Sequence, residues 1–419
     1  MKKVGVGLIG FGTIGTGLIK IIQKEKQTEL KYVVDLDITT HRSVKVNKTL
    51  LTTDVNKVLN DPSVDVIVEL MGGIQPAKKF ILTALKNKKH VVTANKALLA
   101  THGNEIFQTA KDNNVYVKFE ASVAGGIPII KAVRDSFRSS DITSVLGIVN
   151  GTSNFILSRM SLDGQTFSAA LKDAQGLGYS EADASLDIDG VDSAHKIAIL
   201  SSIIYRTRVD MGHIYVEGIR HITLEDIQYA EELGYVIKPL AIANREENKL
   251  DVRVHPVLIS KEHLLSSVSD VYNAIYLRGD SIGEMMFYGL GAGQMPTANA
   301  VYSDIIDIVG KMSAKSNVMD DYSFANRLDI KETSENKLRY YIRFSAVDKP
   351  GVLAKISGIL GNHKISIASV MQKVRKQRGA VPIIMMTHEA EEKNIHSAIR
   401  GIDKLDIIKS KSIIIRVKD

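Results

Sequence analysis

The chain opens with a strand that runs into a glycine-rich turn. Residues 3–9 (KVGVGLI) predict a short strand, and residues 16–24 have the pattern of a helix. Between them lies Gly10-Phe11-Gly12-Thr13-Ile14-Gly15, which has the form G-x-G-x-x-G. The first glycine permits a tight turn, the second lets the backbone approach a pyrophosphate, and the third lets helix and strand pack closely. The stretch therefore predicts a dinucleotide site at a helix N-terminus, where backbone N–H groups favour an anion.

The alternation of strands and helices that follows predicts the fold of residues 1–121. Further strands are expected at residues 30–34, 65–71, 90–93 and 115–119, with helices at residues 76–88 and 105–113. This order is typical of an α/β fold with a doubly wound parallel sheet of the Rossmann type. Ligands of such sheets bind beyond the carboxyl ends of the strands. Thr93, Lys96 and Ser122 lie at these ends and are candidate cofactor contacts.

The choice between NAD and NADP depends on the end of the second strand. Asp35 lies about 20 residues beyond the last glycine, where an acid binds the ribose hydroxyls of NAD. Leu36 offers nothing to a 2′-phosphate, although Arg42 and Lys45 follow closely. The pattern favours NAD and leaves NADP open, and Asp35 could also simply cap a turn.

An acidic stretch at residues 174–196 precedes the apolar run 197–204, which predicts a buried helix. Lys196 stands at the mouth of that helix, one turn after Asp192. A partly desolvated, charge-compensated lysine there is suited to exchanging a proton. From spacing alone, a surface ion pair between residues four apart is the simpler interpretation.

Two polar or glycine-rich loops mark residues 122–314, for which we expect an α+β domain. The loop 150–154 (NGTSN) precedes a helix at 155–160 and suits a small polar substrate, with Gly151 and Thr152 as candidates. The turn 289–293 (GLGAG) precedes a helix that begins near Pro296. Gly291 and Gly293 either close over the nicotinamide side of a cofactor or form a tight loop only. Strands are also expected at residues 145–149, 236–243, 250–259 and 274–277.

The C-terminal region predicts a separate small domain. Residues 315–338 are polar and suggest a linker. Residues 339–419 then show the order βαββαβ, which is typical of a ferredoxin-like fold. Strands are expected at 340–346, 365–370, 381–387 and 412–417, and helices from the corner 348–353 (DKPGVL) to residue 362 and at 390–402.

Composition narrows the function classes. The 419 residues include no cysteine, which excludes disulfides, thiolate metal sites and a cysteine nucleophile. No apolar run is long enough to predict a membrane span. The absence of cysteine also suits a cytoplasmic protein. The formal charge is +7, but the basic residues are dispersed, so we expect no binding to nucleic acid, and we expect none to membranes.

With these motifs in hand, residues 3–312 resemble the homoserine dehydrogenase family. The resemblance is carried by the acidic stretch, with Ala174, Gly178, Tyr179, Ser180, Glu181, Asp183, Asp187, Gly190, Asp192 and Lys196. The blocks GFGTIG, VELMGG, VVTANKALLA, FEASVAGGIP, NGTSNFIL and FYGLGAG match as well. The chain departs from the family at Ala184, where proline is usual, and at Leu36, which is often basic and grips NADP.

The resemblance implies the reversible NAD(P)H-dependent reduction of L-aspartate 4-semialdehyde to L-homoserine. It implies that Glu181 binds the substrate ammonium group, that Asp187 supports it, and that Asp192, Lys196 and Lys96 act at the reacting oxygen. A monovalent cation, with sodium as the expected ion, would bind through Glu120, Val123, Gly125 and Ile127. Asp183 and Asp189 receive no role.

The corner DKPGVL resembles an ACT domain, which implies threonine as a candidate effector; a domain that only dimerises is the simpler alternative. We expect a homodimer or homotetramer. Two other functions remain open at this stage. One is a non-catalytic regulator that senses nucleotides and amino acids, and the other is a dehydrogenase of a different amino-acid semialdehyde.

Overall fold

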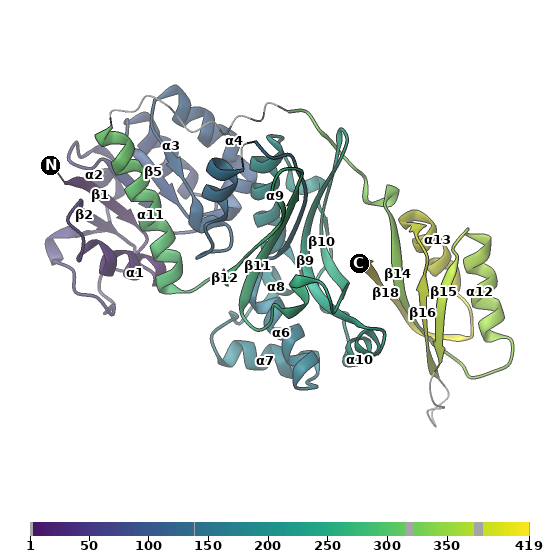
Figure 1. The fold of residues 1–419 in the computed structure, drawn as a ribbon. Helices are drawn as coiled ribbons and strands as arrows, with labels where there is room; N and C mark the ends of the chain where they lie inside the picture. The colour runs from purple at the N-terminus through teal and green to yellow at the C-terminus, as the bar shows by residue number, and fades with distance from the viewer. Residues whose placement is uncertain are drawn as a thin grey trace. The chain divides into compact units, whose positions relative to one another are not determined.

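The computed structural model describes residues 3–418 except for Arg138, residues 315–321, 323, 325 and 373–379. The chain forms two compact units, each assembled from separate stretches (Figure 1). Unit 1 contains Met1–Val149, Asp192–Ile214 and Tyr272–Leu328. Unit 2 contains Asn150–Val191, Tyr215–Val271 and Asp329–Asp419.

Unit 1 contains the expected parallel sheet. Its six strands lie in the order β3-β2-β1-β4-β5-β6, which is the order of a Rossmann fold. The strands are β1 (Val4–Ile9), β2 (Thr28–Val34), β3 (Leu51–Thr52), β4 (Val66–Glu69), β5 (His90–Thr93) and β6 (Val117–Lys118). The helices between them are α1 (Thr13–Ile22), α2 (Val55–Asn60), α3 (Ala77–Lys86) and α4 (Lys96–Asp112). Every residue of β1 and β4 is buried, as expected for strands that are covered on both faces.

Helix α11 (Gln294–Ser313) completes this sheet from a distant part of the sequence. Its residues Ala298, Val301 and Ile305 share one core with Leu18 of α1 and Val6 of β1. Although α11 is 20 residues long, no helix in the described ranges is apolar and long enough to cross a membrane. The expected helix near Pro296 is therefore α11, and it packs in the core of the parallel sheet.

The rest of unit 1 holds an antiparallel sheet and a buried helix. Strands β7 (Ile142–Ile148) and β12 (Gly283–Leu290) both pair with β11 (Tyr272–Gly279). The expected glycine turn at 289–293 is shorter than predicted, because β12 extends through Gly289 and Leu290. Helix α9 (Val191–Tyr205) contains the expected buried run.

Unit 2 is built on a long hairpin and the C-terminal strands. Strands β9 (Tyr235–Glu246) and β10 (Lys249–Ser260) pair along their whole length. The expected turn at 244–248 therefore shrinks to Glu247 and Asn248, and Glu247 has a positive φ of 52°. The helices of this part are α6 (Gly151–Leu162), α7 (Phe167–Gly176), α8 (Ser185–Ile188) and α10 (Leu224–Glu232).

The C-terminal stretch of unit 2 confirms the βαββαβ prediction. It comprises β14 (Lys337–Ala346), α12 (Val352–Asn362), β15 (Ile367–Gln372), β16 (Val381–Thr387), α13 (Glu392–Ile402) and β18 (Ile408–Lys418). The strand order is β18-β14-β16-β15. Both helices cover one face of this sheet, where Ile342, Phe344, Ile356 and Ile395 form a core (Figure 1).

The C-terminal sheet is continuous with the hairpin. Strand β18 pairs with β14 on one side and, in parallel, with β10 on the other. The face of the sheet that the two helices leave open shares a second core with α6 and α10, including Phe155, Ile227, Tyr341, Ile384 and Ile415. The C-terminal domain is therefore an integral part of unit 2 and not an appendage.

Two local expectations were wrong. Helix α4 begins at Lys96 and not near Glu105, because Asn95 caps it by accepting the N–H of Leu98. Within the expected linker, Asp329–Ile330 forms strand β13 on β10, and β14 already begins at Lys337. Residues 315–321 of that stretch lie outside the described residues.

One histidine of the parallel sheet gives a pH prediction. The Nδ1 atom of His90 accepts the N–H of Tyr116 at 3.0 Å, and the two rings stack. Burial lowers the pKa of His90 to about 4, against about 6.5 in an unfolded chain. The stability that depends on neutral His90 is thus present above pH ~6.5 and is lost as the pH falls towards 4.

We expect His90→Gln to reduce the loss of unfolding free energy between pH ~6.5 and ~4, because glutamine does not titrate in this range. The measurement is urea unfolding at several pH values between 7 and 4, with the exposed His388→Gln as the control. The explanation fails if the His90→Gln and wild-type free energies of unfolding fall in parallel over this range.

Candidate active site

The glycine turn has the geometry of an anion-binding loop. A Cβ atom at Gly15 would lie only 2.3 Å from the carbonyl oxygen of Gly10, so the turn requires glycine there. At Gly12, which precedes the first residue of α1, a Cβ would meet nothing within 4 Å. The backbone at Gly12 therefore faces open space at a helix N-terminus, where a phosphate is favoured.

Asp35 contacts this turn directly. Its Oδ2 atom accepts the N–H of Phe11 at 2.5 Å, and its Oδ1 atom accepts the N–H of Asp37 at 2.9 Å. Arg42 folds back over the Phe11 ring and donates to the carbonyl oxygens of Phe11 and Thr40. Asp35 therefore caps the turn after β2, which is the alternative that the sequence left open, and it lies beside the glycine turn, where a ribose-binding acid is expected.

Buried polar groups tie together the carboxyl ends of β4 and β5. Glu69 accepts the hydroxyl hydrogen of Thr93 at 2.6 Å and the N–H of Met71 at 2.9 Å. The Thr93 hydroxyl oxygen accepts the N–H of Asn95, and the Asn95 side chain donates to the Gly73 carbonyl. These bonds fix the start of α4. The backbone of its first residue, Lys96, is therefore held in place.

A carboxylate in α9 bridges two lysines. Asp192 Oδ1 lies 3.0 Å from Lys96 Nζ, and Asp192 Oδ2 lies 2.7 Å from Lys196 Nζ. Lys196 also donates to the carbonyl oxygen of Val149 at 2.6 Å. The side chains of Asp192 and Lys196 are only 9% and 11% exposed. The interpretation as a surface ion pair is therefore wrong, and the pair is a buried, oriented one.

His195 lies beside this bridge and was not singled out in the sequence. Burial lowers the pKa of His195; the Asp192 carboxylate opposes this shift, and the Lys96 and Lys196 ammonium groups add to it. The imidazole is therefore neutral at physiological pH. Its place next to Lys196 in the sequence was the only signal that could have identified it.

The second glycine turn packs against the loop that follows β6. The N–H of Gly126 donates to the carbonyl oxygen of Leu290 at 3.1 Å, just before Gly291. Gly293 precedes α11 and has a φ of 114°. Ser122 is buried and donates its hydroxyl hydrogen to the Phe119 carbonyl. Ser122, Gly291 and Gly293 thus belong to one pair of touching loops in unit 1.

The proposed cation loop is compact and partly buried. The Glu120 carboxylate accepts the N–H groups of Ile130 and Lys131, each at 2.8 Å. Burial raises the pKa of Glu120, and these two hydrogen bonds oppose the shift. No group of three or more acidic or histidine side chains in the described part of the chain could hold a metal ion. A cation here would therefore depend on carbonyl oxygens such as those of Val123 and Gly125.

In unit 2, the NGTSN loop begins a buried helix. Asn150 caps α6 by accepting the N–H of Ser153 at 2.8 Å, and Gly151 is the first helical residue. The Thr152 hydroxyl donates to the carbonyl oxygen of Tyr179 at 2.6 Å. The helix N-terminus is thus tied to the acidic stretch.

Asp187 and Glu181 lie on that acidic stretch. Asp187 Oδ1 accepts a side-chain N–H of Asn150 at 2.7 Å, and its backbone carbonyl accepts the Ser153 hydroxyl. Glu181 is exposed, and its backbone carbonyl accepts a hydrogen bond from the Gln175 side chain at 3.3 Å. Asp187 is therefore fixed by the α6 cap, whereas Glu181 presents its carboxylate to solvent.

The two acids without an expected role have structural partners. Asp183 accepts the N–H of Ser185 at 3.0 Å at the start of α8. Asp189 forms an ion pair with Arg220, which also donates to the Ser185 hydroxyl. Both acids therefore shape the turn around α8.

The expected site residues fall into two groups, one in each unit. Unit 1 holds Lys96, Asp192 and Lys196 with the cofactor candidates, and unit 2 holds Gly151, Thr152, Glu181 and Asp187. Sequence reasoning did not assign the supporting residues Glu69, Asn95, Asn150 and Arg220. Two of these four, Asn95 and Asn150, follow predicted strand ends and cap helices, which is a usable signal for capping residues.

Comparisons with known proteins match this architecture along the whole chain. The family model described as homoserine dehydrogenase matches residues 128–306, and its NAD binding domain matches residues 10–120. The ACT domain model matches residues 340–406. The ferredoxin-like prediction and the corner motif thus agree with the family match.

Full-length relatives carry the same name. The homoserine dehydrogenase of Synechocystis sp. is 42% identical over 430 residues, covering 99% of this chain and 99% of that protein. The Pseudomonas aeruginosa enzyme is 41% identical, covering 100% of this chain and 99% of its own. The crystal structure of a homoserine dehydrogenase from Thiobacillus denitrificans has a TM-score of 0.92 at 41% identity, covering 100% of this chain and 99% of that one. A hyperthermophilic archaeal homoserine dehydrogenase in complex with NADPH has a TM-score of 0.63 at 26% identity, covering 74% of this chain and 98% of that one.

The double role of Asn150 predicts its effect on stability. Asn150→Ala removes both the α6 cap and the bond to the Asp187 carboxylate, so we expect a loss of about 2–3 kcal/mol. Thr166 caps α7 without touching Asp187, and Thr166→Ala should cost about 1 kcal/mol. Urea unfolding of both variants gives the comparison. Equal losses would show that the bond to Asp187 contributes nothing.

Proposed function

Because the chain belongs to the homoserine dehydrogenase family, we propose that its Asp192–lysine bridge is the proton-transfer site of that reaction. The reaction is the reversible reduction of L-aspartate 4-semialdehyde to L-homoserine with a nicotinamide nucleotide. The observation that supports the assignment is one buried carboxylate held by two lysines at 3.0 and 2.7 Å. A non-catalytic sensor has no need for such an arrangement.

Lys196 is the proton-transfer residue in this proposal. During reduction, the Lys196 ammonium group donates a proton to the oxygen that becomes the hydroxyl of homoserine. During oxidation, the neutral amine takes that proton back. Asp192 and the Val149 carbonyl orient the Nζ atom. The charge of Lys96 stabilises the developing negative charge on the same oxygen.

Substrate binding is assigned to unit 2. The exposed carboxylate of Glu181 pairs with the substrate ammonium group, which has the opposite charge. Asp187, held by Asn150, supports this contact, and the N-terminus of α6 at Gly151 and Thr152 favours the substrate carboxylate. The first turn of α6 contains no acidic residue, which supports an anion there.

The nicotinamide nucleotide binds to the glycine turn at residues 10–15, with the second glycine turn and the strand ends at Thr93 and Ser122 as further contacts. The bound nucleotide supplies or accepts the hydride. We propose that NAD is preferred, because the acid Asp35 sits beside the turn and its neighbour Leu36, 94% exposed, carries no charge. The donors of Arg42 are already engaged by Phe11, Thr40 and Asp37.

A monovalent cation such as sodium is proposed for the loop that contains Glu120, Val123, Gly125 and Ile127. Hard cations prefer oxygen ligands. No hydrogen bond among the described residues uses the carbonyl oxygens of Val123 and Gly125, whereas the Ile127 carbonyl already accepts the N–H of Ile129 at 2.8 Å. The buried Glu120 carboxylate supplies the matching negative charge.

Regulation and assembly complete the proposal. A pocket of about 350 Å³ lies at the corner between β14 and α12, lined by residues that include Asp348, Gly351 and Gln372. Its size and its place at a helix N-terminus suit an amino-acid effector such as threonine. Exposed Tyr288 and Leu290 on β12 suit an interface in a homodimer or homotetramer.

Removal of the Lys196 amine tests the proton-transfer role. We expect Lys196→Ala to lower kcat for homoserine oxidation by about 100-fold or more, with nucleotide binding retained. Absorbance at 340 nm gives the rate, and the fluorescence of bound NADH gives the binding. Lys172→Ala, on α7, is the matched control. Near wild-type turnover of Lys196→Ala would refute the assignment.

The cofactor preference is tested at Leu36. In the wild type we expect a higher kcat/KM with NAD than with NADP. Leu36→Arg should lower the KM for NADP by about tenfold through pairing with the 2′-phosphate. Leu36→Gln, without the charge, should have little effect. A wild-type preference for NADP would contradict the assignment of NAD.

A further inference from the structure

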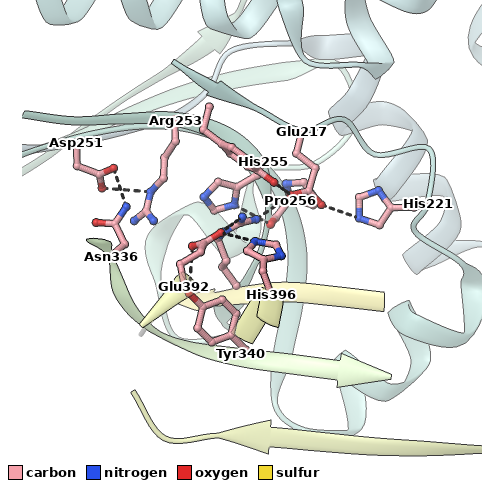
Figure 2. Close-up of polar contacts among 12 residues, drawn as sticks. Glu217, His221, Asp251, Arg253, His255, Pro256, Asn336, Tyr340, Glu392 and His396 are labelled. Carbon is pink, nitrogen blue, oxygen red and sulfur yellow. Dashed lines mark hydrogen bonds and ion pairs between the residues drawn. The ribbon is translucent and has the colours of Figure 1, made fainter. Parts of the chain in front are cut away.

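A buried cluster of charged groups lies where strand β18 joins the ACT domain to β10 (Figure 2). In β18, Arg416 pairs with Tyr340 of β14 on one side and with Val257 of β10 on the other. Its side chain is only 3% exposed. A buried guanidinium is stable only where its charge and its N–H donors are matched.

The Arg416 guanidinium joins two carboxylates from different parts of unit 2. Its Nη1 atom donates to Glu217 at 2.8 Å, and its Nε atom donates to both oxygens of Glu392 at 3.0 and 3.1 Å. The guanidinium also lies over the Tyr215 ring. Glu392 begins α13 of the ACT domain, whereas Glu217 follows the short strand β8 (Tyr215–Val216). One side chain therefore connects the ACT domain to residues 215–220, which we call the bridging segment.

Both carboxylates are charged, although Glu392 is buried and Glu217 is half-buried. Burial alone would raise the pKa of Glu217, but the His221 ring, 3.1 Å away, and the Arg416 charge hold it well below its usual value. Burial would likewise raise the pKa of Glu392, yet hydrogen bonds from His396 and Arg416 lower it to about 2. Figure 2 shows Glu217 paired with His221 and Glu392 beside His396. Loss of Arg416 would remove the charge that the two carboxylates share, so each would take up a proton or shift its position.

The bridging segment is in backbone contact with α8. A Cβ atom at Gly218 would lie 2.2 Å from the carbonyl oxygen of Ile188, so only glycine permits this approach. The N–H of Ile219 donates to the same carbonyl at 2.8 Å. A displacement of Glu217 is therefore transmitted directly to the end of α8.

A second contact ties the same segment to the acidic stretch. Arg220 forms an ion pair with Asp189 and donates to the hydroxyl of Ser185 at 3.1 Å. Ser185 is the first residue of α8, and Asp189 directly follows its last residue. The helix carries Asp187, whose carboxylate accepts an N–H of the Asn150 side chain. The bridging segment and the α6 cap thus clamp α8 between them.

We propose that Arg416 is a positioning residue for the substrate. Through Glu217 and the bridging segment, the C-terminal strand of the ACT domain holds α8 and Asp187 in the geometry that binds the amino-acid substrate. This inference rests on the proposed substrate-binding role of Asp187. It makes strand β18 part of the substrate site in addition to being part of the regulatory domain.

Steady-state kinetics of the full-length protein test this role. We expect Arg416→Gln to raise the KM for homoserine about fivefold or more, with the KM for the nicotinamide nucleotide within about twofold of wild type. Arg416→Lys keeps the charge but not the paired geometry, so its KM for homoserine should lie between the wild-type value and that of Arg416→Gln.

Arg343 provides a matched control on the neighbouring strand. It joins β14 of the ACT domain to α10 through Asp226 at 2.6 Å and Glu225 at 3.3 Å, and both partners lie outside the bridging segment. Arg343→Gln therefore breaks a comparable ion pair, and we expect an unchanged KM for homoserine. The proposal is overturned if Arg416→Gln leaves this KM unchanged, or if Arg343→Gln raises it equally.

Two further variants keep the test decisive. If Arg416→Gln does not fold, Glu217→Gln breaks the same charge pair with little change in size, and an unchanged KM for homoserine then sinks the proposal. Glu181→Ala tests the substrate assignment separately. A raised KM in Glu181→Ala alone refutes the positioning role of Arg416. A raised KM in Arg416→Gln alone refutes the ammonium contact of Glu181 and leaves the positioning role intact.

Discussion

The attraction between one carboxylate and two ammonium groups is the interaction on which the candidate proton-transfer site in unit 1 depends. Lys96 and Lys196 carry like charges and would repel each other if Asp192 did not lie between them. The protein holds this arrangement at the starts of two helices, α4 and α9. The start of α4 is fixed by the Asn95 cap, and in α9 the Lys196 side chain is held by the Val149 carbonyl. A chemically useful pair of lysines thus depends on ordinary capping and hydrogen bonding.

Much of this could be predicted because the signals are local. The strand, glycine turn and helix at residues 3–24 follow one another directly in the sequence. The strands and helices of the C-terminal βαββαβ domain do the same. The Asp192–Lys196 pair was recognised from its spacing, but burial decided between a surface pair and an oriented one, and burial depends on the whole fold. The bond from Thr93 to Glu69 joins neighbouring strands and leaves no periodic pattern. The start of α4 was missed because one Asn95 cap outweighed the weak apolar periodicity that follows it.

The C-terminal domain shows the same limit at a larger scale. Its fold could be predicted from its own residues, but its attachment could not. Strand β18 pairs with β10 over Val257–Ile259, and the second face of its sheet shares a core with α6 and α10. Arg416, Glu217 and Glu392 come from three distant stretches, and only the assembled sheet brings them together. Pairings of high sequence separation of this kind are invisible to local pattern analysis.

Helix α11 has a consequence for how the protein is made. It supplies part of the core beneath α1 and β1, although it begins only at Gln294. During synthesis, the first sheet therefore emerges from the ribosome with an apolar face uncovered, and it stays so for on the order of ten seconds or more while the intervening chain is translated. The nascent chain must wait for its own later sequence or be shielded by a chaperone. A fragment ending at Ala121 would expose the same surface permanently and would be prone to aggregate.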